Sequence, residues 1–501
     1  MSVKLGTSRK SIRLVFLLAI LVISMVSVGL STQYSYPATF AAHGSISYWP
    51  IVNVVINTSK VVGLNNLSLG FQLDWHHWVI FKDRPTQRQL ARDVGFKLIR
   101  VFDFRKTSRY GYPNLMPCTY WNEAAKTGTW DWTQVDNLTQ AIFSVGAEPL
   151  YCLGWMRDNI QNYIPPGMAV NPNTGLPYPE SYAAYAKEWV KHFKALGLPV
   201  RYYQISNEPY FYFGWSSSPK LGYYVDLWNT VARAMRSENP NILLSNDAIK
   251  MKILLDYWLT HGDDVDYLDF HKYDADTAGQ YTNAEMLIRA EQMQFETYGS
   301  FYGVSEARQK WFSARGKWLP VINSESNLDS AWETGTDPRI QQMTGAVWLA
   351  LVLRTAMLKG LTYSVYFEFC SSRSQQEAQG TGWGFGMINE DDNHPWYPYY
   401  AQKMMGSNLA VGDKLVMAQS SSDDIRSIAW VNQGKVNILL ICKVDQTRTV
   451  ILQGISGQLD ISWINNMIPY QTPSIQSGKI SSNEPLTING YTVALLQILS
   501  S

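Results

Sequence analysis

The stretch PESYAAYAKEWVKHFKALGLPVRYYQISNEP, residues 179–209, contains one copy of the pattern that decides the fold of this chain. Its first part begins with Pro179-Glu180, which suits a helix start, and Gly197 suits the helix stop. Between them the apolar residues follow the helical spacing i, i+3, i+4 and i+7. These apolar residues are Tyr182, Tyr185, Ala186, Trp189, Val190, Phe193 and Leu196. The apolar run Arg201–Ile205 comes next and predicts a strand, so the stretch is one helix–strand unit of an α/β protein.

The same alternation of short apolar runs and amphipathic segments recurs along the chain. The predicted strands are Leu69–Leu73, Lys97–Phe102, Glu148–Leu153, Arg201–Ile205, Ile242–Ser245, Val265–Phe270, Leu319–Ile322 and Thr362–Phe367. Eight such units favour a closed parallel (β/α)8 barrel of the TIM type. An open doubly wound sheet is the alternative, but no glycine-rich phosphate loop follows the first strand.

The N-terminus has the pattern of an export signal. Basic residues precede an unbroken apolar run from Leu14 to Leu30. Residues 1–32 are therefore predicted to be either a signal peptide or an N-terminal membrane anchor. We expect a secreted or extracellular protein, with a membrane tether through this segment as the alternative.

The rest of the chain divides into three predicted regions. Residues 33–62 are a spacer and a strand, and residues 63–408 form the barrel. Residues 409–501 alternate short apolar runs with turns, which predicts an antiparallel β-sandwich. The early run Ile46–Val62 is also strand-like, and its pairing with the sandwich would make that domain discontinuous.

Composition limits the classes of partner. The 501 residues carry a formal net charge of +1, so no strong field favours nucleic acid, and none is expected as a partner. The chain contains 19 Trp and 30 Tyr, and some of these rings stand beside polar loop residues, an arrangement that suits sugar rings. The four cysteines show no metal-ligand spacing, and Cys152 and Cys370 are interpreted as buried thiols.

Polar residues follow the predicted strands. In a barrel of this kind, catalytic groups sit at the C-terminal ends of the strands, so these residues outline a candidate site. In chain order they are Asp74-Trp75-His76-His77, Arg100 and Asp103, Trp155 with Arg157 and Asp158, Ser206-Asn207-Glu208-Pro209, Asn246-Asp247, His271-Lys272-Tyr273, Asn323-Ser324-Glu325-Ser326-Asn327, and Glu368.

Two carboxylates in this set are the candidate catalytic residues. Glu208 and Glu325 each follow an apolar strand and are flanked by amide or hydroxyl side chains. Their places after the fourth and seventh strands predict that they face each other across the mouth of the barrel. Glycoside cleavage needs such a pair, one acid to protonate the leaving oxygen and one carboxylate to attack or to activate water. A separation of about 5–5.5 Å would give retention and about 6.5–9.5 Å inversion.

Four stretches resemble clan A glycoside hydrolases, and most of all family 39, which contains β-xylosidases and α-iduronidases. Tyr203–Pro209 resembles the acid/base strand of that family, and Pro320–Glu325 resembles its nucleophile strand. Trp130–Trp155 resembles its second helix and third strand, and Gly384–Tyr400 the segment after its eighth strand. The resemblance implies a retaining glycoside hydrolase with Glu208 as acid/base and Glu325 as nucleophile.

The chain departs from the family pattern at three places. Ser206 stands where the family usually has Trp before Asn-Glu-Pro, and Ser324-Glu325-Ser326 stands for Thr-Glu-Trp. Phe367-Glu368-Phe369 stands where the eighth strand usually offers Trp. These differences leave the mechanism in place but leave the sugar open, so we expect a β-linked polysaccharide or oligosaccharide of xylan, glucan or mannan type.

Several neighbours are predicted to support the two carboxylates. Asn207 is expected to bind the sugar 2-hydroxyl, while Arg100 and Tyr273 are expected to hold Glu325 as an anion. Glu208 is expected to have a raised pKa, because burial and the charge of Glu325 both favour its protonated form. The remaining candidate substrate contacts are His77, Trp155, His271, Glu368 and Trp383.

Other chemistries find less support in the sequence. The residues His76, His77, His271, Asp74 and Asp274 could gather at the barrel mouth, but no metal-ligand spacing supports a metal site. No cofactor is expected. A non-catalytic carbohydrate-binding protein on the same barrel and a transglycosylase remain as alternatives.

Overall fold

The computed structural model describes residues 49–74, 77–102, 104, 116–154, 160–216, 218–331, 335–372 and 384–499. The N-terminal apolar run, His76, Trp155 and Trp383 lie outside these residues, so what was predicted for them stays a prediction. Across the described ranges, no helix has both the length and the apolar character needed to cross a bilayer.

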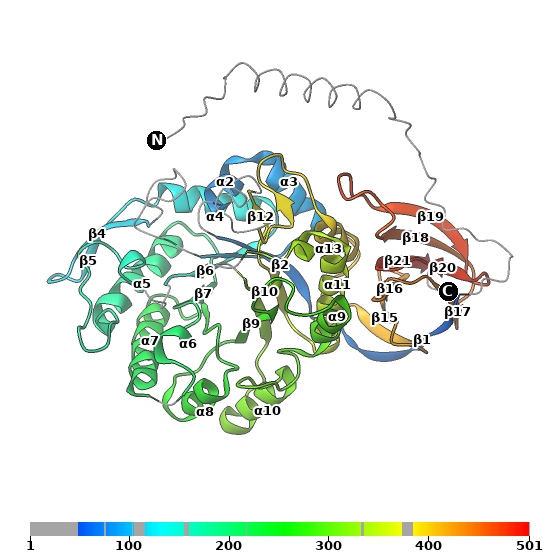
Figure 1. The fold of residues 1–501 in the computed structure, drawn as a ribbon. Helices are drawn as coiled ribbons and strands as arrows, with labels where there is room; N and C mark the ends of the chain where they lie inside the picture. The colour runs from blue at the N-terminus through cyan, green and yellow to red at the C-terminus, as the bar shows by residue number, and fades with distance from the viewer. Residues whose placement is uncertain are drawn as a thin grey trace, which may run out of the picture. The chain divides into compact units, whose positions relative to one another are not determined.

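Eight strands form one sheet in the order β8-β7-β6-β3-β2-β11-β10-β9, and every neighbouring pair is parallel (Figure 1). The Asp266 N–H donates to the Leu244 carbonyl at 2.8 Å and bridges the seam between the two ends of this order. The strands are β2 (Ser68–Leu73), β3 (Leu98–Val101), β6 (Glu148–Cys152), β7 (Tyr202–Gln204), β8 (Leu243–Ser245), β9 (Leu268–Ala275), β10 (Val321–Asp329) and β11 (Tyr363–Tyr366). The predicted fold class, a (β/α)8 barrel with a C-terminal β domain, is confirmed.

Helices connect the strands and surround the sheet (Figure 1). Helix α5 (Pro179–Ala195) buries the predicted apolar positions except Leu196, which is 51% exposed because the helix ends one residue before it. The other helices are α2 (His77–Asp83), α3 (Pro85–Val94), α4 (Thr133–Ser144), α6 (Tyr210–Phe213), α7 (Pro219–Glu238), α8 (Lys252–His261), α9 (Asn283–Gln292), α10 (Val304–Arg315), α11 (Met343–Leu358) and α13 (Tyr397–Gly406).

The barrel interior changes from apolar to polar along the strands. A cluster of buried apolar side chains fills its first layer: Leu98, Leu150, Tyr202, Tyr267, Ile322, Tyr363 and Val365. Side chains two residues further along a strand share the same face, so Arg100, Gln204, Asp269 and Ser324 form the next layer. Gln204 joins them, accepting from Arg100 at 2.7 Å and donating to Asp269 at 2.5 Å and to Ser324 at 3.2 Å. This polar layer is the floor on which the candidate site rests.

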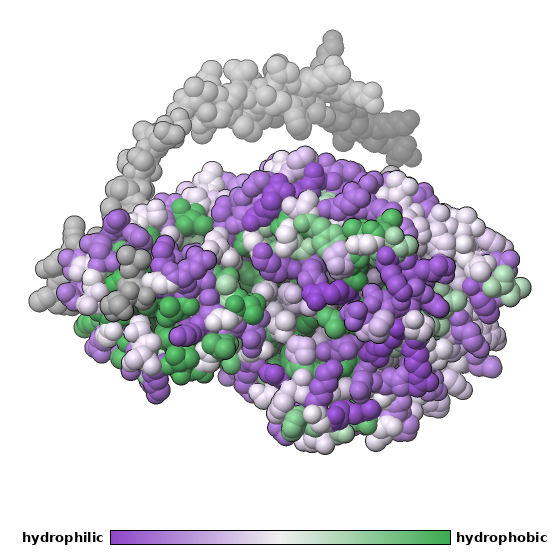
Figure 2. All heavy atoms as spheres, turned by 180° about the vertical axis from the view of Figure 1, so that it is seen from behind, coloured by the Kyte–Doolittle hydropathy of each residue, from purple (hydrophilic) through white to green (hydrophobic). Residues whose placement is uncertain are grey.

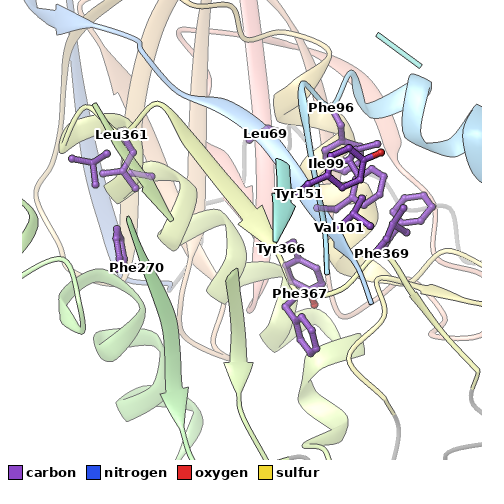
Figure 3. Close-up of a cluster of buried hydrophobic side chains, with 14 of the residues drawn as sticks. Leu69, Phe96, Ile99, Val101, Tyr151, Phe270, Leu361, Tyr366, Phe367 and Phe369 are labelled. Carbon is purple, nitrogen blue, oxygen red and sulfur yellow. The ribbon is translucent and has the colours of Figure 1, made fainter. Parts of the chain in front are cut away.

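The outer face of the strands packs against the helices through a separate set of apolar side chains. Figure 3 shows Val101, Tyr151 and Phe369 in this set, gathered beside the strands. The rings of Phe71 on β2 and Phe369 stack with their centroids 4.2 Å apart, a contact that stabilises aromatic pairs beyond their burial. Because Phe369 comes directly after Glu368, this stacking fixes the chain at the end of the eighth strand.

The second domain is a nine-stranded sheet in the order β19-β18-β21-β16-β15-β14-β1-β17-β20. Strand β1 (Ile51–Leu64) pairs antiparallel with β14 and parallel with β17, so the sheet is mixed rather than wholly antiparallel. No hairpin joins β1 to β17, and their relative direction is therefore not constrained by a turn. The other strands are β14 (Lys414–Ser420), β15 (Ile425–Asn432), β16 (Lys435–Cys442), β17 (Arg448–Gln453), β18 (Gln458–Ile464), β19 (Gln476–Ser481), β20 (Leu486–Ile488) and β21 (Thr492–Leu499).

Strand β16 explains how this sheet meets the barrel. Leu439 and Ile441 belong to the same buried cluster as the helices and strands of the barrel. Ile438, Leu440 and Cys442 belong to a second cluster within the sheet domain. Side chains alternate across a strand, so an unbroken apolar run serves two cores at once.

Smaller features complete the fold. Two short two-stranded sheets were not predicted: β4 (Cys118–Asn122) with β5 (Thr127–Trp130), which is antiparallel, and β12 (Cys370–Ser371) with β13 (Ile388–Asn389), which is parallel. Two 3-10 turns span Ile160–Asn162 and Pro338–Gln341. All four cysteines are buried and free, including the two interpreted as buried thiols.

Strand β9 carries site residues on one face and a buried ion pair on the other. Lys272 donates to Asp274 at 2.9 and 3.1 Å, and the indole N–H of Trp348 donates to the same carboxylate at 2.6 Å. Both charged residues are 0% exposed. Removing one partner of such a pair leaves an uncompensated buried charge. We therefore expect Asp274→Ala to lower the free energy of unfolding by about 3–5 kcal/mol, measured by urea denaturation.

The control for this prediction is Asp276→Ala. Asp276 lies two residues further along and is exposed. Its replacement is expected to change the free energy of unfolding by less than about 0.5 kcal/mol. Equal small effects of the two substitutions would show that the Lys272–Asp274 pair does not hold β9.

Candidate active site

The structure brings Glu208 and Glu325 together. One carboxylate oxygen of each, and one ring nitrogen of His271, all lie within 4.8 Å of one another. Glu208 stands after β7 and Glu325 within β10, so 117 residues of chain separate two groups that share one small volume. The upper limit of 4.8 Å lies below the roughly 6.5–9.5 Å of a carboxylate pair that leaves room for a water, and so favours the close pair of about 5–5.5 Å.

A β-bulge aims Glu325 at the site. The pairing of β10 with β9 slips between Asn323, which faces Phe270, and Glu325, which faces the next residue, His271. The extra residue, Ser324, points inward, where it accepts from Gln204. Without the bulge, strict alternation would turn Glu325 away from the interior, because neighbouring residues of a strand face opposite sides. Bulges of this kind often re-aim side chains beside active sites.

Two donors hold the Glu325 carboxylate. The Arg100 guanidinium donates to Oε2 at 2.7 Å, and the Tyr273 hydroxyl donates to Oε1 at 2.5 Å. Both partners were predicted from the sequence to lie here. The two oxygens are thus fixed by different donors, which sets the orientation of the carboxylate plane.

Arg100 is the hub that connects the polar layer to the site. It is 0% exposed and donates to Gln72, Gln204 and Asn207 as well as to Glu325. The bond to Asn207 Oδ1 measures 2.5 Å and fixes the amide next to Glu208. Because Arg100 is wholly buried, it positions the residues of the site rather than reaching into open space.

Glu208 adopts a backbone conformation that few residues tolerate. Its φ angle is +45°, in the left-handed region. The Asp247 carboxylate, at the end of β8, accepts the Glu208 N–H at 2.6 Å and holds this turn. The Glu208 side chain accepts from the Tyr210 hydroxyl at 2.6 Å and pairs with His271 Nδ1 at 3.0 Å.

His271 lies among three carboxylates. Its Nδ1 is 3.0 Å from Glu208 and 3.8 Å from Glu325, and its Nε2 is 3.5 Å from Asp247. Burial lowers the pKa of His271, but the charges of Glu325, Glu208 and Asp247 together outweigh it and raise that pKa to about 9. The ring is therefore a cation at neutral pH.

The charge of His271 corrects one expectation. Burial raises the pKa of Glu208, as predicted, but the hydrogen bond and charge of His271, with the Tyr210 hydroxyl and Arg100, outweigh it. The net result is a lowered pKa, so Glu208 is an anion paired with His271. The sequence-based expectation of a raised pKa was wrong because it left out the cation beside the carboxylate.

Asp247 behaves in the opposite way. Burial raises its pKa to about 7, against the lowering effects of His271, Arg100 and the Glu208 N–H. The sequence placed Asp247 at the end of the fifth strand but gave it no role. The only sequence signal for Asp247 was its position after a strand, because carboxylates at the C-terminal ends of barrel strands all lie at the same mouth of the barrel.

His77 and Glu368 meet in a neighbouring cluster. His77 Nδ1 lies 2.6 Å from Glu368, and its Nε2 lies 3.3 Å from Glu390. Burial, then the charges of Glu390 and Glu325, raise the pKa of Glu368. The two predicted contact residues are 2% and 1% exposed, and their contact with substrate stays a prediction.

The site thus gathers most of the residues expected from the sequence. Hydrogen bonds join Glu325, Arg100, Asn207 and Tyr273 in one group. Glu208 is hydrogen-bonded to His271, whose Nδ1 lies 3.8 Å from Glu325. Asp247 was in the strand-end set without a role, and the residues that the sequence missed are Tyr210, Gln72 and Gln204. Gln72 and Gln204 lie within predicted strands, where no sequence signal separates a site residue from a core residue.

Metal binding is the other chemistry to weigh at these residues. Among the described residues, Glu208, His271 and Glu325 are the group whose ligand atoms stand close enough to hold an ion. A metal ligand must be deprotonated, yet His271 carries a proton below about pH 9 and Arg100 already neutralises Glu325. Of the wider set considered from the sequence, Asp274 is paired with Lys272 instead.

Comparison with known proteins gives similarity of fold but not of sequence. No protein-family model matches this sequence, and a search of curated protein sequences finds no match. Many solved structures do match, and three of them, which match with similar quality, illustrate the range. They are a GH39 β-xylosidase from Caulobacter crescentus (15% identity, 90% of this chain and 100% of that chain, TM-score 0.59), a GH51 α-L-arabinofuranosidase from Thermotoga petrophila RKU-1 (12%, 89% and 100%, 0.62) and a GH30 endoxylanase from Clostridium papyrosolvens C71 (13%, 89% and 100%, 0.57).

These matches show that the chain has the fold of several glycoside hydrolase families. The alignment covers the whole of the compared chains, so it includes the β domain as well as the barrel. GH39 is among the matches, as the motifs indicated, but GH51 and GH30 match equally well, and family 39 is not singled out.

Proposed function

We propose that this protein is a retaining glycoside hydrolase that cleaves β-linked oligosaccharide or polysaccharide by double displacement. The single observation that carries the proposal is the pair Glu208 and Glu325, with an oxygen of each within 4.8 Å of the other and of His271. Two carboxylates this close can act on opposite sides of one glycosidic bond. The glycoside hydrolases that share the fold add weight to this choice among the reactions a barrel can host.

In the first step, Glu325 attacks the anomeric carbon. Arg100 and Tyr273 orient its carboxylate, and a lone pair of one oxygen forms the new bond. The bond from that carbon to the glycosidic oxygen breaks, and its electron pair stays on the leaving oxygen. Glu208 donates a proton to this oxygen, and the product is a glycosyl ester of Glu325.

In the second step, water releases the sugar. Glu208, now an anion, accepts a proton from a water molecule, and the water oxygen attacks the anomeric carbon. The ester bond breaks and its electron pair returns to Glu325. Two inversions at the same carbon give net retention. Asn207 has its oxygen bound to Arg100, which leaves its amide N–H groups for the sugar 2-hydroxyl.

His271 supplies the proton that the first step needs. The lowered pKa makes Glu208 an anion, yet His271 stands 3.0 Å from it with a proton on the ring. As the sugar approaches Glu325, a proton moves from His271 Nδ1 to Glu208 Oε1, and Glu208 passes it on. Glu208 and His271 therefore titrate together as a single acid. The proton that they share is lost when the pH rises to about the pKa of His271.

This arrangement predicts an unusual pH dependence. The pKa of His271 is raised to about 9, so the pair keeps its proton below that pH and loses it as the pH rises through about 9. We expect kcat/KM to fall on the alkaline side near pH 9, and His271→Asn to move this fall to lower pH by at least about one unit. A pH profile on an aryl glycoside measures both. An unchanged alkaline limb in the variant would show that Glu208 holds its proton without His271.

Activity and stereochemistry test the proposed function directly. The protein is incubated with a panel of aryl β-glycosides and β-linked oligosaccharides, and the anomer first released is read by NMR. Release of the β-anomer supports the proposal, and release of the α-anomer or the absence of any turnover contradicts it. The reaction is repeated with added acceptor sugar to separate hydrolysis from transglycosylation. A transglycosylase transfers the released sugar mainly to the acceptor, whereas a hydrolase transfers it mainly to water.

We also propose that the enzyme is exported. This rests on the basic residues and the apolar run Leu14–Leu30 at the N-terminus. Polymeric substrate is met outside the cell, which fits the proposed activity. Fractionation of cells with an antibody to the barrel tests export, and the mass of the mature chain separates a cleaved signal peptide from a retained anchor.

A further inference from the structure

A run of aromatic side chains extends away from Glu208. Apolar groups occur on several parts of the surface, and Figure 2 shows them separated by polar side chains on one face. Isolated groups of this kind are ordinary. The set beside Glu208 is different because its rings touch one another. We call Tyr210, Phe211, Trp215 and Phe301 the aromatic platform.

The platform begins at the carboxylate itself. The Tyr210 hydroxyl donates to Glu208 Oε1 at 2.6 Å. The ring of Tyr210 lies 4.7 Å from that of Phe211 and 4.9 Å from that of Trp215, centroid to centroid. Trp215 in turn lies 5.9 Å from Phe301, edge to face. The contacts therefore form a continuous path from the proposed acid/base outward.

The backbone builds this path from a short stretch of chain. Helix α6 begins directly after Glu208-Pro209 and ends at Phe213. Gly214 has φ = +83°, a conformation that glycine adopts without strain, and it turns the chain so that Trp215 returns over Tyr210. The far end comes from another loop, where Phe301 and Tyr298 exchange two backbone hydrogen bonds.

The outer rings are open to solvent. Trp215 is 54% exposed and Phe211 is 42% exposed. Most large aromatics of the described chain are packed in its cores, including Trp189, Trp228 and Trp348 at 0%. Core packing therefore does not explain why Trp215 and Phe211 stand where they do, and their exposed area is open to a ligand.

The mechanism indicates which ligand covers them. This step rests on the proposed function: an acid/base residue protonates the leaving oxygen, so the leaving group lies on its side of the site. We infer that the aromatic platform binds the sugar units on the leaving-group side of the cleaved bond. The substrate class is then a β-linked chain that continues past the cleavage point, rather than a sugar joined to a small aglycone.

The chemistry of the platform favours sugar over a lipid or phenolic aglycone. Sugar rings present apolar C–H faces with polar edges, and the platform offers ring faces together with the Tyr210 hydroxyl. Tyr210 is tilted by 40° against Phe211 and by 42° against Trp215, so the rings do not merge into one flat apolar wall. The two exposed rings, Phe211 and Trp215, are the ones open to sugar units.

The test compares two substrates of one sugar. A glycosyl fluoride has no ring in its leaving group, whereas a β-linked oligosaccharide of four or more units extends over the platform. Trp215→Ala is expected to lower kcat/KM for the oligosaccharide by at least about tenfold more than for the fluoride. Trp318→Ala is the control: Trp318 is 50% exposed but stacks on Phe312 at the opposite end of the barrel, before β10. It is expected to keep both rates within about twofold.

Each outcome decides one question. A larger loss on the oligosaccharide, absent in the Trp318 variant, supports the platform. Equal losses on both substrates, or none, overturn the platform while leaving the hydrolase intact, because wild-type turnover of the fluoride still stands. A similar selective loss with an alkyl glycoside of a long-chain alcohol, and none with the oligosaccharide, would assign the surface to an apolar aglycone instead. Failure of the wild-type protein to turn over any of these overturns the proposed function itself and the platform with it.

Discussion

Replacing Glu325 by glutamine is expected to reduce kcat/KM on the best aryl β-glycoside by about four orders of magnitude or more. The amide keeps the shape of the side chain but cannot form the glycosyl ester. Arg100 donates to this carboxylate at 2.7 Å in the wild-type protein, and in the variant it loses its anionic partner. Initial rates at several substrate concentrations measure the loss, and circular dichroism checks that the fold is kept.

The matched control is Glu148→Gln. Glu148 begins β6 at the other end of the barrel and pairs with Arg201 at the surface, so its replacement is expected to change kcat/KM by less than about twofold. A further check uses Glu325→Ala with azide. The small anion can occupy the vacated space and attack the anomeric carbon directly, giving a glycosyl azide of inverted configuration. Wild-type-like turnover by the glutamine variant would end the assignment of Glu325 as nucleophile.

The framework of the barrel could be predicted because its signal is local. Each strand is a short apolar run, and each helix has its own apolar periodicity, as in Pro179–Ala195. The strand limits were less certain where tertiary pairing extends a strand. β9 and β10 run on to Ala275 and Asp329, so His271, Tyr273 and Glu325 lie inside strands instead of following them. The extension depends on the pairing between β9 and β10, which neither segment specifies alone.

The candidate site could be predicted only as a set of strand-end residues. The bulge at Ser324 decides that Glu325 faces inward, yet one extra residue in a pairing leaves no mark on the sequence. The lowered pKa of Glu208 was missed for a related reason. It depends on a proton on His271, and that proton is held by carboxylates from three different strands. The net effect of these charges on a pKa depends on their positions in the folded chain, and the sequence does not give those positions.

Tyr210 is a second residue whose role could not be predicted from the sequence. In the sequence, Tyr210-Phe211-Tyr212 follows the polar residues Ser206–Glu208, and nothing there separates the roles of the three rings. In the structure, the Tyr210 hydroxyl meets Glu208, while the Tyr212 hydroxyl donates to the Thr174 carbonyl at 2.7 Å and so anchors the helix. Two tyrosines of one short helix thus have different roles, one in the site and one in the scaffold, and the direction of each side chain decides which.

Replacing Glu208 by alanine is expected to give a second large effect, with a different signature. Loss of the proton donor and base should lower kcat/KM on an oligosaccharide by about 10²–10⁴-fold. On an aryl glycoside with a good leaving group, Glu325 can still form its ester without acid assistance. The missing base then makes release of the sugar slow, so a burst of free phenol before a slow steady state is expected.

Azide should rescue the steady state of this variant. As an anion it needs no base, and it can enter the space that the Glu208 side chain leaves beside His271, which stands 3.0 Å from the removed oxygen. Because azide then attacks the ester of Glu325, the product is a glycosyl azide with the same anomeric configuration as the substrate. The opposite configuration is expected from Glu325→Ala, so one pair of NMR spectra assigns both roles. Inverted azide from the Glu208 variant would exchange the two assignments, and no azide product from either would remove the double displacement on which the function rests.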